Sequence, residues 1–114
     1  MCTENQAIAI LHEVYDSCNR LFNQKIVDAY LYGSYARGDY HDESDVDIFL
    51  TVDAEPDQLA SYRKSICQVC SDLSLKYDVL VSPAIQSLRQ FRQYQGTLPY
   101  YQNIIREGIR YAAG

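Results

Sequence analysis

The sequence predicts one α/β domain (α+β in some classification schemes) in which helices pack on a small mixed β-sheet. Three observations predict it. The 114 residues suit one compact domain with one core, the N-terminal region has the spacing of an amphipathic helix, and short runs of β-forming residues follow it. No repeat, linker or low-complexity segment divides the chain, so residues 1–114 are expected to form a single domain.

The first half of the chain predicts a helix and then two strands. Apolar residues recur at spacings of three and four over residues 5–22, as in an amphipathic helix. Residues 26–32 are apolar and rich in β-forming residues, and apolar side chains alternate along residues 45–52, so both segments predict strands. Between the strands we expect a short helical turn at residues 34–38 and a polar loop at residues 39–44.

The second half predicts three more helices around a third strand. After Pro56, a long helix is expected over residues 57–75, followed by a strand over residues 77–82 that Pro83 stops. Two helices are then expected, over residues 84–94 and 99–107. For the latter, Thr97 is the predicted cap, Pro99 lies in the first turn and Gly108 follows the end. Residues 109–113 either add a short edge strand or trail off.

Four cysteines are present, and their positions favour a structural role. Cys67 and Cys70 are spaced as in some zinc and redox sites, but they lie inside a helical pattern with no second pair at zinc-site spacing. We therefore expect both thiols to be buried in the core, as Cys18 should be on its own apolar helix face. Cys2 is expected to lie in a frayed N-terminus.

The acidic composition excludes some partners. The formal net charge is −5, and six of the fifteen acidic residues fall between Asp39 and Asp53, which disfavours direct binding of nucleic acid. No apolar run approaches the ~20 residues that span a bilayer, and the N-terminus lacks a secretory signal pattern, so we expect a cytoplasmic protein with no membrane contact. A bound divalent cation would explain the crowded acids.

Two of these acids lie on one predicted strand. Because side chains alternate along a strand, Asp45 and Asp47 are expected to project from the same face. Paired carboxylates on a rigid strand suit Mg²⁺ or Mn²⁺, with substrate phosphates completing the coordination. Asp78 begins the third predicted strand and would reach the same point if that strand lies beside the second.

The turn before the loop predicts a phosphate site. Gly33 permits close backbone approach at the junction of a strand and a helical turn. The N–H groups of that turn and the Ser34 hydroxyl can then donate to phosphate oxygens. A plain turn with Ser34 as the helix cap is the alternative, and both interpretations are compatible. Arg37 either contacts phosphate or pairs with an acid and braces the turn.

Taken together, these motifs resemble the minimal nucleotidyltransferase family of the polymerase-β superfamily. Gly33-Ser34 is followed after ten residues by Asp45-x-Asp47, and residues 103–108 also look like that family. The resemblance implies a polymerase-β-like fold and a metal-dependent nucleotidyltransferase. It implies two Mg²⁺ ions in the site, for which Mn²⁺ or another divalent ion could substitute. It implies catalytic, metal-binding roles for Asp45, Asp47 and Asp78, and nucleotide-binding roles for Gly33, Ser34, Arg37 and Ser44.

The resemblance also implies a reaction and a partner. Small members of this kind pair with a helical HEPN-type RNase toxin and act as type VII-like antitoxins, adenylylating a tyrosine of the toxin with AMP from ATP or another nucleoside triphosphate. Two alternatives stay open: a nucleotide-binding subunit of a two-protein nucleotidyltransferase acting on a small molecule, and a non-catalytic antitoxin module. The acceptor, the preferred nucleotide, the number of units transferred and the choice between homodimer and hetero-oligomer also stay open.

Overall fold

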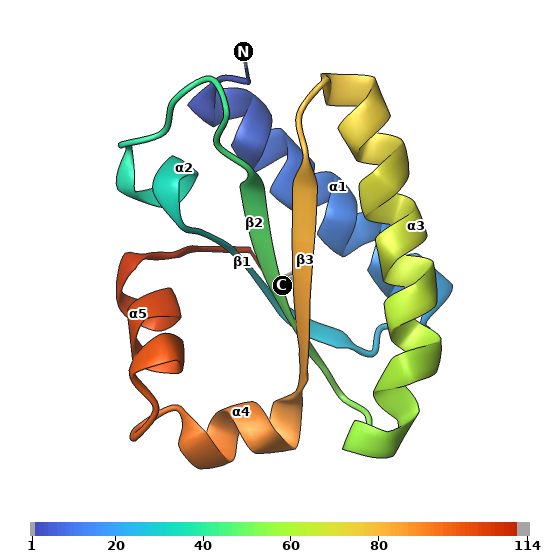
Figure 1. The fold of residues 1–114 in the computed structure, drawn as a ribbon. Helices are drawn as coiled ribbons and strands as arrows, with labels where there is room; N and C mark the ends of the chain where they lie inside the picture. The colour runs from blue at the N-terminus through green and yellow to red at the C-terminus, as the bar shows by residue number, and fades with distance from the viewer. Residues whose placement is uncertain (1, 112–114) are drawn as a thin grey trace.

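The computed structural model describes residues 2–111, which form one mixed sheet with helices on both faces (Figure 1). The helices are α1 (Glu4–Leu21), α2 (Ser34–Arg37), the 3₁₀ turn η1 (Pro56–Gln58), α3 (Leu59–Tyr77), α4 (Leu88–Tyr94) and α5 (Pro99–Glu107). The strands are β1 (Ile26–Tyr32), β2 (Val46–Val52), β3 (Val81–Ser87) and β4 (Ile109–Tyr111). The predicted α/β domain with a small mixed sheet is confirmed.

The first helix begins at a cap that the sequence encodes. The Thr3 side chain accepts a hydrogen bond from the Gln6 backbone N–H (3.1 Å), and the Gln6 side chain accepts one from the Thr3 backbone N–H (2.9 Å). This reciprocal pair satisfies two donors that a helix start otherwise leaves open. From there α1 runs along the sheet and directs its apolar stripe inward.

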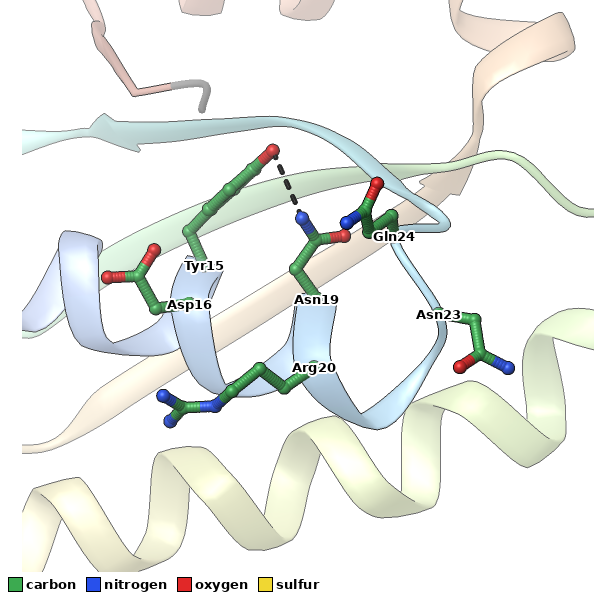
Figure 2. A pocket seen from close by; sticks show the side chains of 6 residues that line it. All are labelled: Tyr15, Asp16, Asn19, Arg20, Asn23 and Gln24. Carbon is green, nitrogen blue, oxygen red and sulfur yellow. Dashed lines mark hydrogen bonds between the residues drawn. The ribbon is translucent and has the colours of Figure 1, made fainter. Parts of the chain in front are cut away.

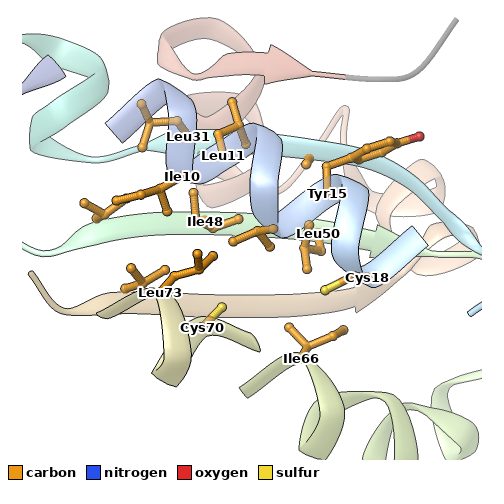
Figure 3. Packing of buried hydrophobic residues seen from close by; sticks show 14 of the residues in the cluster. Ile10, Leu11, Tyr15, Cys18, Leu31, Ile48, Leu50, Ile66, Cys70 and Leu73 are labelled. Carbon is orange, nitrogen blue, oxygen red and sulfur yellow. The ribbon is translucent and has the colours of Figure 1, made fainter. Parts of the chain in front are cut away.

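The helices α1 and α3 cover one face of the sheet, and the main core lies between these helices and the sheet (Figures 1 and 3). Val46, Ile48 and Leu50 of β2 are fully buried on this face. The helices contribute Ile10, Leu11, Val14 and Cys18 from α1, and Ile66, Cys70 and Leu73 from α3. Alternation along β2 therefore directs Asp47 and Phe49 to the opposite face.

The strand order is β3-β2-β1-β4. The strand β1 runs antiparallel to both β2 and β4, whereas β2 and β3 are parallel and are joined by α3. At the β4 edge, Arg110 donates from Nε to the Asp28 carboxylate of β1 (2.7 Å). Of the two alternatives for residues 109–113, the structure shows the short edge strand for Ile109–Tyr111, while Ala112 and Ala113 lie outside the described residues.

The other face of the sheet carries α4 and α5 over a second, smaller core. We call this the aromatic cluster; its members are Tyr30, Phe49, Phe91, Tyr101 and Ile104. Phe49 lies at its centre, with ring centroids 5.4 Å from Phe91 and 5.8 Å from Tyr101. The aromatic cluster thereby holds the C-terminal helices against the face that Asp47 shares.

The third strand was predicted in the wrong place. Residues 77–80 do not form a strand, because α3 continues to Tyr77 and Asp78 follows as its cap, and β3 begins only at Val81. Pro83 does not stop β3. It lies within the strand, because β3 is an edge strand and proline's missing N–H leaves no ladder partner unsatisfied there. Residues 84–87, predicted as helix, instead pair in parallel with residues 49–52 of β2.

Three smaller predictions are also wrong. Cys2 is not frayed but 3% exposed, and Cys67 is exposed, whereas Cys18 and Cys70 are buried as predicted. Thr97 does not cap α5, because Leu98 occupies the cap position; the Thr97 hydroxyl instead donates to the Tyr94 carbonyl (3.3 Å).

Within the described residues, the helices are all too short or too polar to cross a membrane.

Candidate functional site

The turn after β1 has the geometry that its Gly-Ser sequence predicts. Gly33 adopts φ 76° and ψ −152°, a conformation that L side chains rarely adopt, and it precedes α2 as the cap. Its carbonyl accepts from the N–H groups of Ala36 (3.2 Å) and Arg37 (3.1 Å). The N–H groups of Ser34 and Tyr35 therefore lie at the open end of the turn. Because Gly33 occupies the cap position, the alternative of Ser34 as the cap is wrong.

Asp47 lies directly against this turn. A Cβ atom added to Gly33 would come within 2.5 Å of Asp47 Oδ2, so only glycine leaves room for the carboxylate. The contact follows from the sheet, because Asp47 of β2 pairs with Tyr32 of β1, the residue before Gly33. The structure thus brings the Gly-Ser turn and the second acid of the Asp45-x-Asp47 motif together.

The two acids of the motif interact electrostatically. Burial raises the pKa of Asp47, the negative charge of Asp45 raises that pKa further, and the positive charge of Arg37 opposes both effects. Asp45 immediately precedes β2 and is half-buried, as is Asp47. Ionised Asp47 is therefore unfavourable in this place unless positive charge lies nearby. A divalent cation between the two carboxylates would supply that charge.

Asp78 lies elsewhere than predicted. It ends α3 with φ 54° and ψ 48°, and it shares a hollow of about 430 Å³ with Asp42, Ser44 and Asp45. The β3 residue in register with Asp47 is Ser82. The residues that the structure describes contain no group of three or more His, Cys, Asp or Glu side chains placed to hold a metal ion. The structure therefore associates Asp78 with Asp45, but does not gather Asp45, Asp47 and Asp78 around one point.

Two further predicted residues shape the loop around the acids. Arg37 donates from Nε to Asp39 Oδ2 (3.3 Å), so it pairs with an acid, and it also lines a cavity beside Gly33. Ser44 closes the loop: its hydroxyl accepts from the His41 backbone N–H (2.9 Å), and its own N–H donates to the His41 carbonyl (3.0 Å). Their nucleotide-binding roles stay predictions.

The side chains on the other wall of that cavity have no predicted role of their own, although residues 103–108 are part of the family resemblance. Tyr32 lines it from β1, and Tyr100, Asn103 and Glu107 line it from α5. Their sequence signal is weak but present, since residues 100, 103 and 107 follow the three-and-four spacing of one helix face. What the sequence does not show is that this face of α5 lies beside Gly33.

A separate polar hollow of about 390 Å³ lies at the C-terminal end of α1 (Figure 2). Tyr15, Asp16, Asn19 and Arg20 line it from the helix, and Asn23 and Gln24 line it from the turn before β1. Gly33 follows the other end of β1, so this hollow is separate from the turn and the acids described above.

Comparisons with known sequences identify the family of the chain. The family described as the nucleotidyltransferase domain matches residues 11–111. Two proteins of Methanocaldococcus jannaschii, each named "putative protein adenylyltransferase", are similar to the chain. One is 39% identical over 80 residues, covering 70% of this chain and 79% of that protein. The other is 30% identical over 98 residues, covering 86% of this chain and 90% of that protein.

Solved structures share the fold at lower identity. A crystal structure of a "putative nucleotidyltransferase" from Sulfolobus solfataricus matches with a TM-score of 0.59 and 17% identity, over 94% of this chain and 80% of that chain. A toxin–antitoxin complex with AMP-PNP matches with a TM-score of 0.53 and 20% identity, over 88% of this chain and 72% of that chain. The family match and the two sequence relatives confirm the predicted resemblance, and the chain belongs to the nucleotidyltransferase domain family.

Proposed function

We propose that this chain is a metal-dependent protein adenylyltransferase that transfers AMP from ATP to a hydroxyl group of a partner protein. The observation that carries the proposal is the Asp47 carboxylate resting on Gly33 with the charge of Asp45 beside it. This arrangement puts a candidate metal-binding pair next to a candidate phosphate-binding turn. The names of the two Methanocaldococcus relatives support protein as the acceptor class.

The donor set fits Mg²⁺. This ion is commonly held by one or two carboxylates together with substrate phosphates, and Asp45 and Asp47 supply two carboxylates whose charges interact. We propose that they hold two Mg²⁺ ions with the triphosphate, Mn²⁺ being the substitute. When bound, the metal would stabilise negative charge on the attacking and leaving oxygens.

The remaining residues of the turn position the nucleotide. The N–H groups of Ser34 and Tyr35 and the Ser34 hydroxyl would donate to the outer phosphates, and Arg37 would add positive charge. The acceptor hydroxyl would pass its proton to the Asp78 carboxylate, and its oxygen would bond to the α-phosphorus. The bond from that phosphorus to the β-phosphate oxygen would break, and pyrophosphate would leave.

The acceptor would approach through the hollow that Asp45 shares with Asp78. Leu75 and Leu80 line the same hollow and are 83% and 58% exposed. Exposed apolar side chains beside reactive acids favour a protein acceptor over a small molecule. We propose a tyrosine of a helical HEPN-type toxin as the acceptor, with this chain as the antitoxin. Asp78 would then act on the acceptor side of Asp45.

The test combines the purified chain with Mg²⁺, a helical HEPN-type candidate partner, and ATP labelled at the α-phosphate. We expect the partner to become labelled, and we expect no label from ATP carrying it at the γ-phosphate. Asp47→Asn should lower the transfer rate by about a thousandfold, because metal stabilisation of the transition state is worth several kcal/mol.

The matched control is Asp53→Asn. Asp53 is exposed and follows the other end of β2, so this variant should transfer AMP at the wild-type rate. Asp47→Asn should fold with undiminished thermal stability, because burial and the charge of Asp45 raise the pKa of Asp47, and an acid with a raised pKa destabilises the folded state when it ionises there. Asparagine also adopts the left-handed conformation of Asp78, so Asp78→Asn should keep the fold. Because Asp78 is proposed to act on the acceptor, this variant should slow transfer without weakening nucleotide binding. Tight association without label would identify a binding module instead of an enzyme.

A further inference from the structure

A cavity of about 190 Å³ lies between the Gly-Ser turn and α5, and we call it the α5 cavity. Gly33 and Arg37 line it on the side of the turn, and Tyr32 lines it from the end of β1. Tyr100, Asn103 and Glu107 line it from α5. Gly33 thus has the α5 cavity on one side and the Asp47 carboxylate on another. A molecule held at the turn is therefore adjacent to the α5 cavity.

We propose that the α5 cavity binds the purine base of the nucleotide, with α5 as the wall that reads it. This inference rests on the proposed function, since it names the place of the base within the same nucleotide site. It assigns binding roles to Tyr100, Asn103 and Glu107.

Charge decides between the two hollows beside the acid pair. The hollow on the Asp78 side is lined by Asp42, Glu43, Asp45 and Asp78, and it would repel a triphosphate that lies along it. The α5 cavity is lined by Arg37 at the turn and by a single acid, Glu107, so it opposes a negatively charged ligand far less than the acidic hollow does. The nucleotide is therefore directed toward α5, and the acidic hollow is left for the acceptor.

Two tyrosines give the α5 cavity a wall for stacking. The Tyr32 ring packs edge-on against Phe49, with centroids 6.5 Å apart, and its hydroxyl accepts a hydrogen bond from the Tyr100 hydroxyl (3.1 Å). Tyr100 also packs edge-on against Phe49 at 6.1 Å, yet it is 48% exposed. Tyr100 is therefore a positioned aromatic ring that solvent still reaches, which is what a stacking base requires.

Polar side chains on the same helix face can read the edge of the base. Asn103 Oδ1 accepts from Arg106 (2.7 Å), so its amide N–H groups are the ones available to donate to a ring nitrogen. The Glu107 carboxylate, one helical turn further, can accept from an exocyclic amino group. Adenine offers both an acceptor nitrogen and an amino group, whereas hypoxanthine has a carbonyl oxygen in place of that amino group. ATP should accordingly bind more tightly than ITP.

The test measures nucleotide binding by calorimetry in Mg²⁺, without an acceptor. For AMP-PNP, Tyr100→Ala should weaken binding by roughly tenfold through lost stacking. Tyr100→Phe, which keeps the ring, should bind nearly as the wild type does. Tyr94→Ala is the matched control, because Tyr94 is 41% exposed at the end of α4 and does not line the α5 cavity. Thermal melts of each variant check the fold.

Specificity provides a second, independent arm. The wild type should prefer ATP over ITP by roughly tenfold, and Glu107→Gln should largely remove that preference, because glutamine can donate to the carbonyl of hypoxanthine. A wild-type chain that binds no nucleotide would overturn both proposals. A different result is that the wild type binds ATP and transfers AMP while Tyr100→Ala binds AMP-PNP equally well and ATP and ITP bind alike. That result would overturn the assignment of the α5 cavity to the base and leave the proposed function standing.

Discussion

At the scale of single residues, Gly33 determines where the Asp47 carboxylate can lie. Its positive φ forms the turn, and its missing Cβ leaves the space that Asp47 Oδ2 occupies. A side chain at this position would therefore disturb the backbone and the acid pair at once. Gly38 also has a positive φ, of 88°, but a Cβ there would meet no atom within 4 Å. A substitution at Gly38 therefore strains the backbone alone, whereas one at Gly33 also displaces the acid.

We predict that Gly33→Ala and Gly38→Ala differ in both stability and activity. Gly38→Ala should lower the free energy of unfolding by about 1–2 kcal/mol, the cost of a left-handed alanine. Gly33→Ala should lower it further, because its φ of 76° and ψ of −152° lie in a region nearly restricted to glycine and its Cβ would meet Asp47. Only Gly33→Ala should also slow AMP transfer, by about a hundredfold, because it displaces a group that must be held in place for the reaction. Urea unfolding and initial transfer rates measure the two effects. Equal activity in both variants would contradict the role given to the Gly33–Asp47 contact.

At the scale of elements, α3 shows what helical periodicity decides and what it leaves open. The apolar spacing predicted a long helix there, which is confirmed for Leu59–Tyr77. It also predicted that Cys67 and Cys70 are both buried. Ile66, Cys70 and Leu73 form the buried stripe, and Cys67, about 100° around the helix from Ile66, is exposed. The width of a buried stripe depends on the partner surface, which the sequence pattern does not contain.

We predict that thiol labelling of the native protein modifies Cys67 first. Burial raises the pKa of Cys18 and of Cys70 to about 12, and it raises the pKa of Cys2 as well. Thiolate is the reactive form, so these three buried thiols stay protonated and shielded at pH 7.5, which leaves the exposed Cys67 as the accessible thiol. Mass spectrometry after iodoacetamide treatment measures this, with Cys67→Ser as the control that should remain unlabelled. Early modification of Cys70 would contradict the orientation of α3.

At the scale of the whole molecule, two cores of unequal size support the sheet. The main core lies under α1 and α3, and the aromatic cluster holds α4 and α5 on the other face. Tyr101 of the cluster also accepts, at its hydroxyl, a hydrogen bond from the Gln86 side chain of β3 (2.8 Å). Because α5 forms a wall of the α5 cavity, the smaller core positions residues of the proposed nucleotide site.

We predict that Phe91→Ala loosens α4 and α5 before the rest of the protein. Phe91 is 3% exposed, and truncating a buried phenylalanine costs about 3–5 kcal/mol. Native-state hydrogen exchange should show faster exchange in α4 and α5 with α1 still protected, together with weaker AMP-PNP binding. Ile66→Ala in the main core is the control, and it should accelerate exchange throughout. Uniform acceleration in Phe91→Ala would show instead that the two cores unfold as one unit.

The sequence by itself determined the local features of this protein. Periodicity predicted α1, β1, β2 and α5, and the Gly33-Ser34 and Asp45-x-Asp47 motifs predicted the family that the comparisons confirm. These features depend on neighbouring residues, so the chain carries them directly.

Only the tertiary structure decided the rest. It decided that β3 is an edge strand that tolerates Pro83, that Asp78 ends α3 beside Asp45, and that one face of α5 lines a cavity next to Gly33. Each of these depends on which segments distant in sequence lie together. Strand order and helix docking are set by burial summed over the whole core, which no local pattern of residues records.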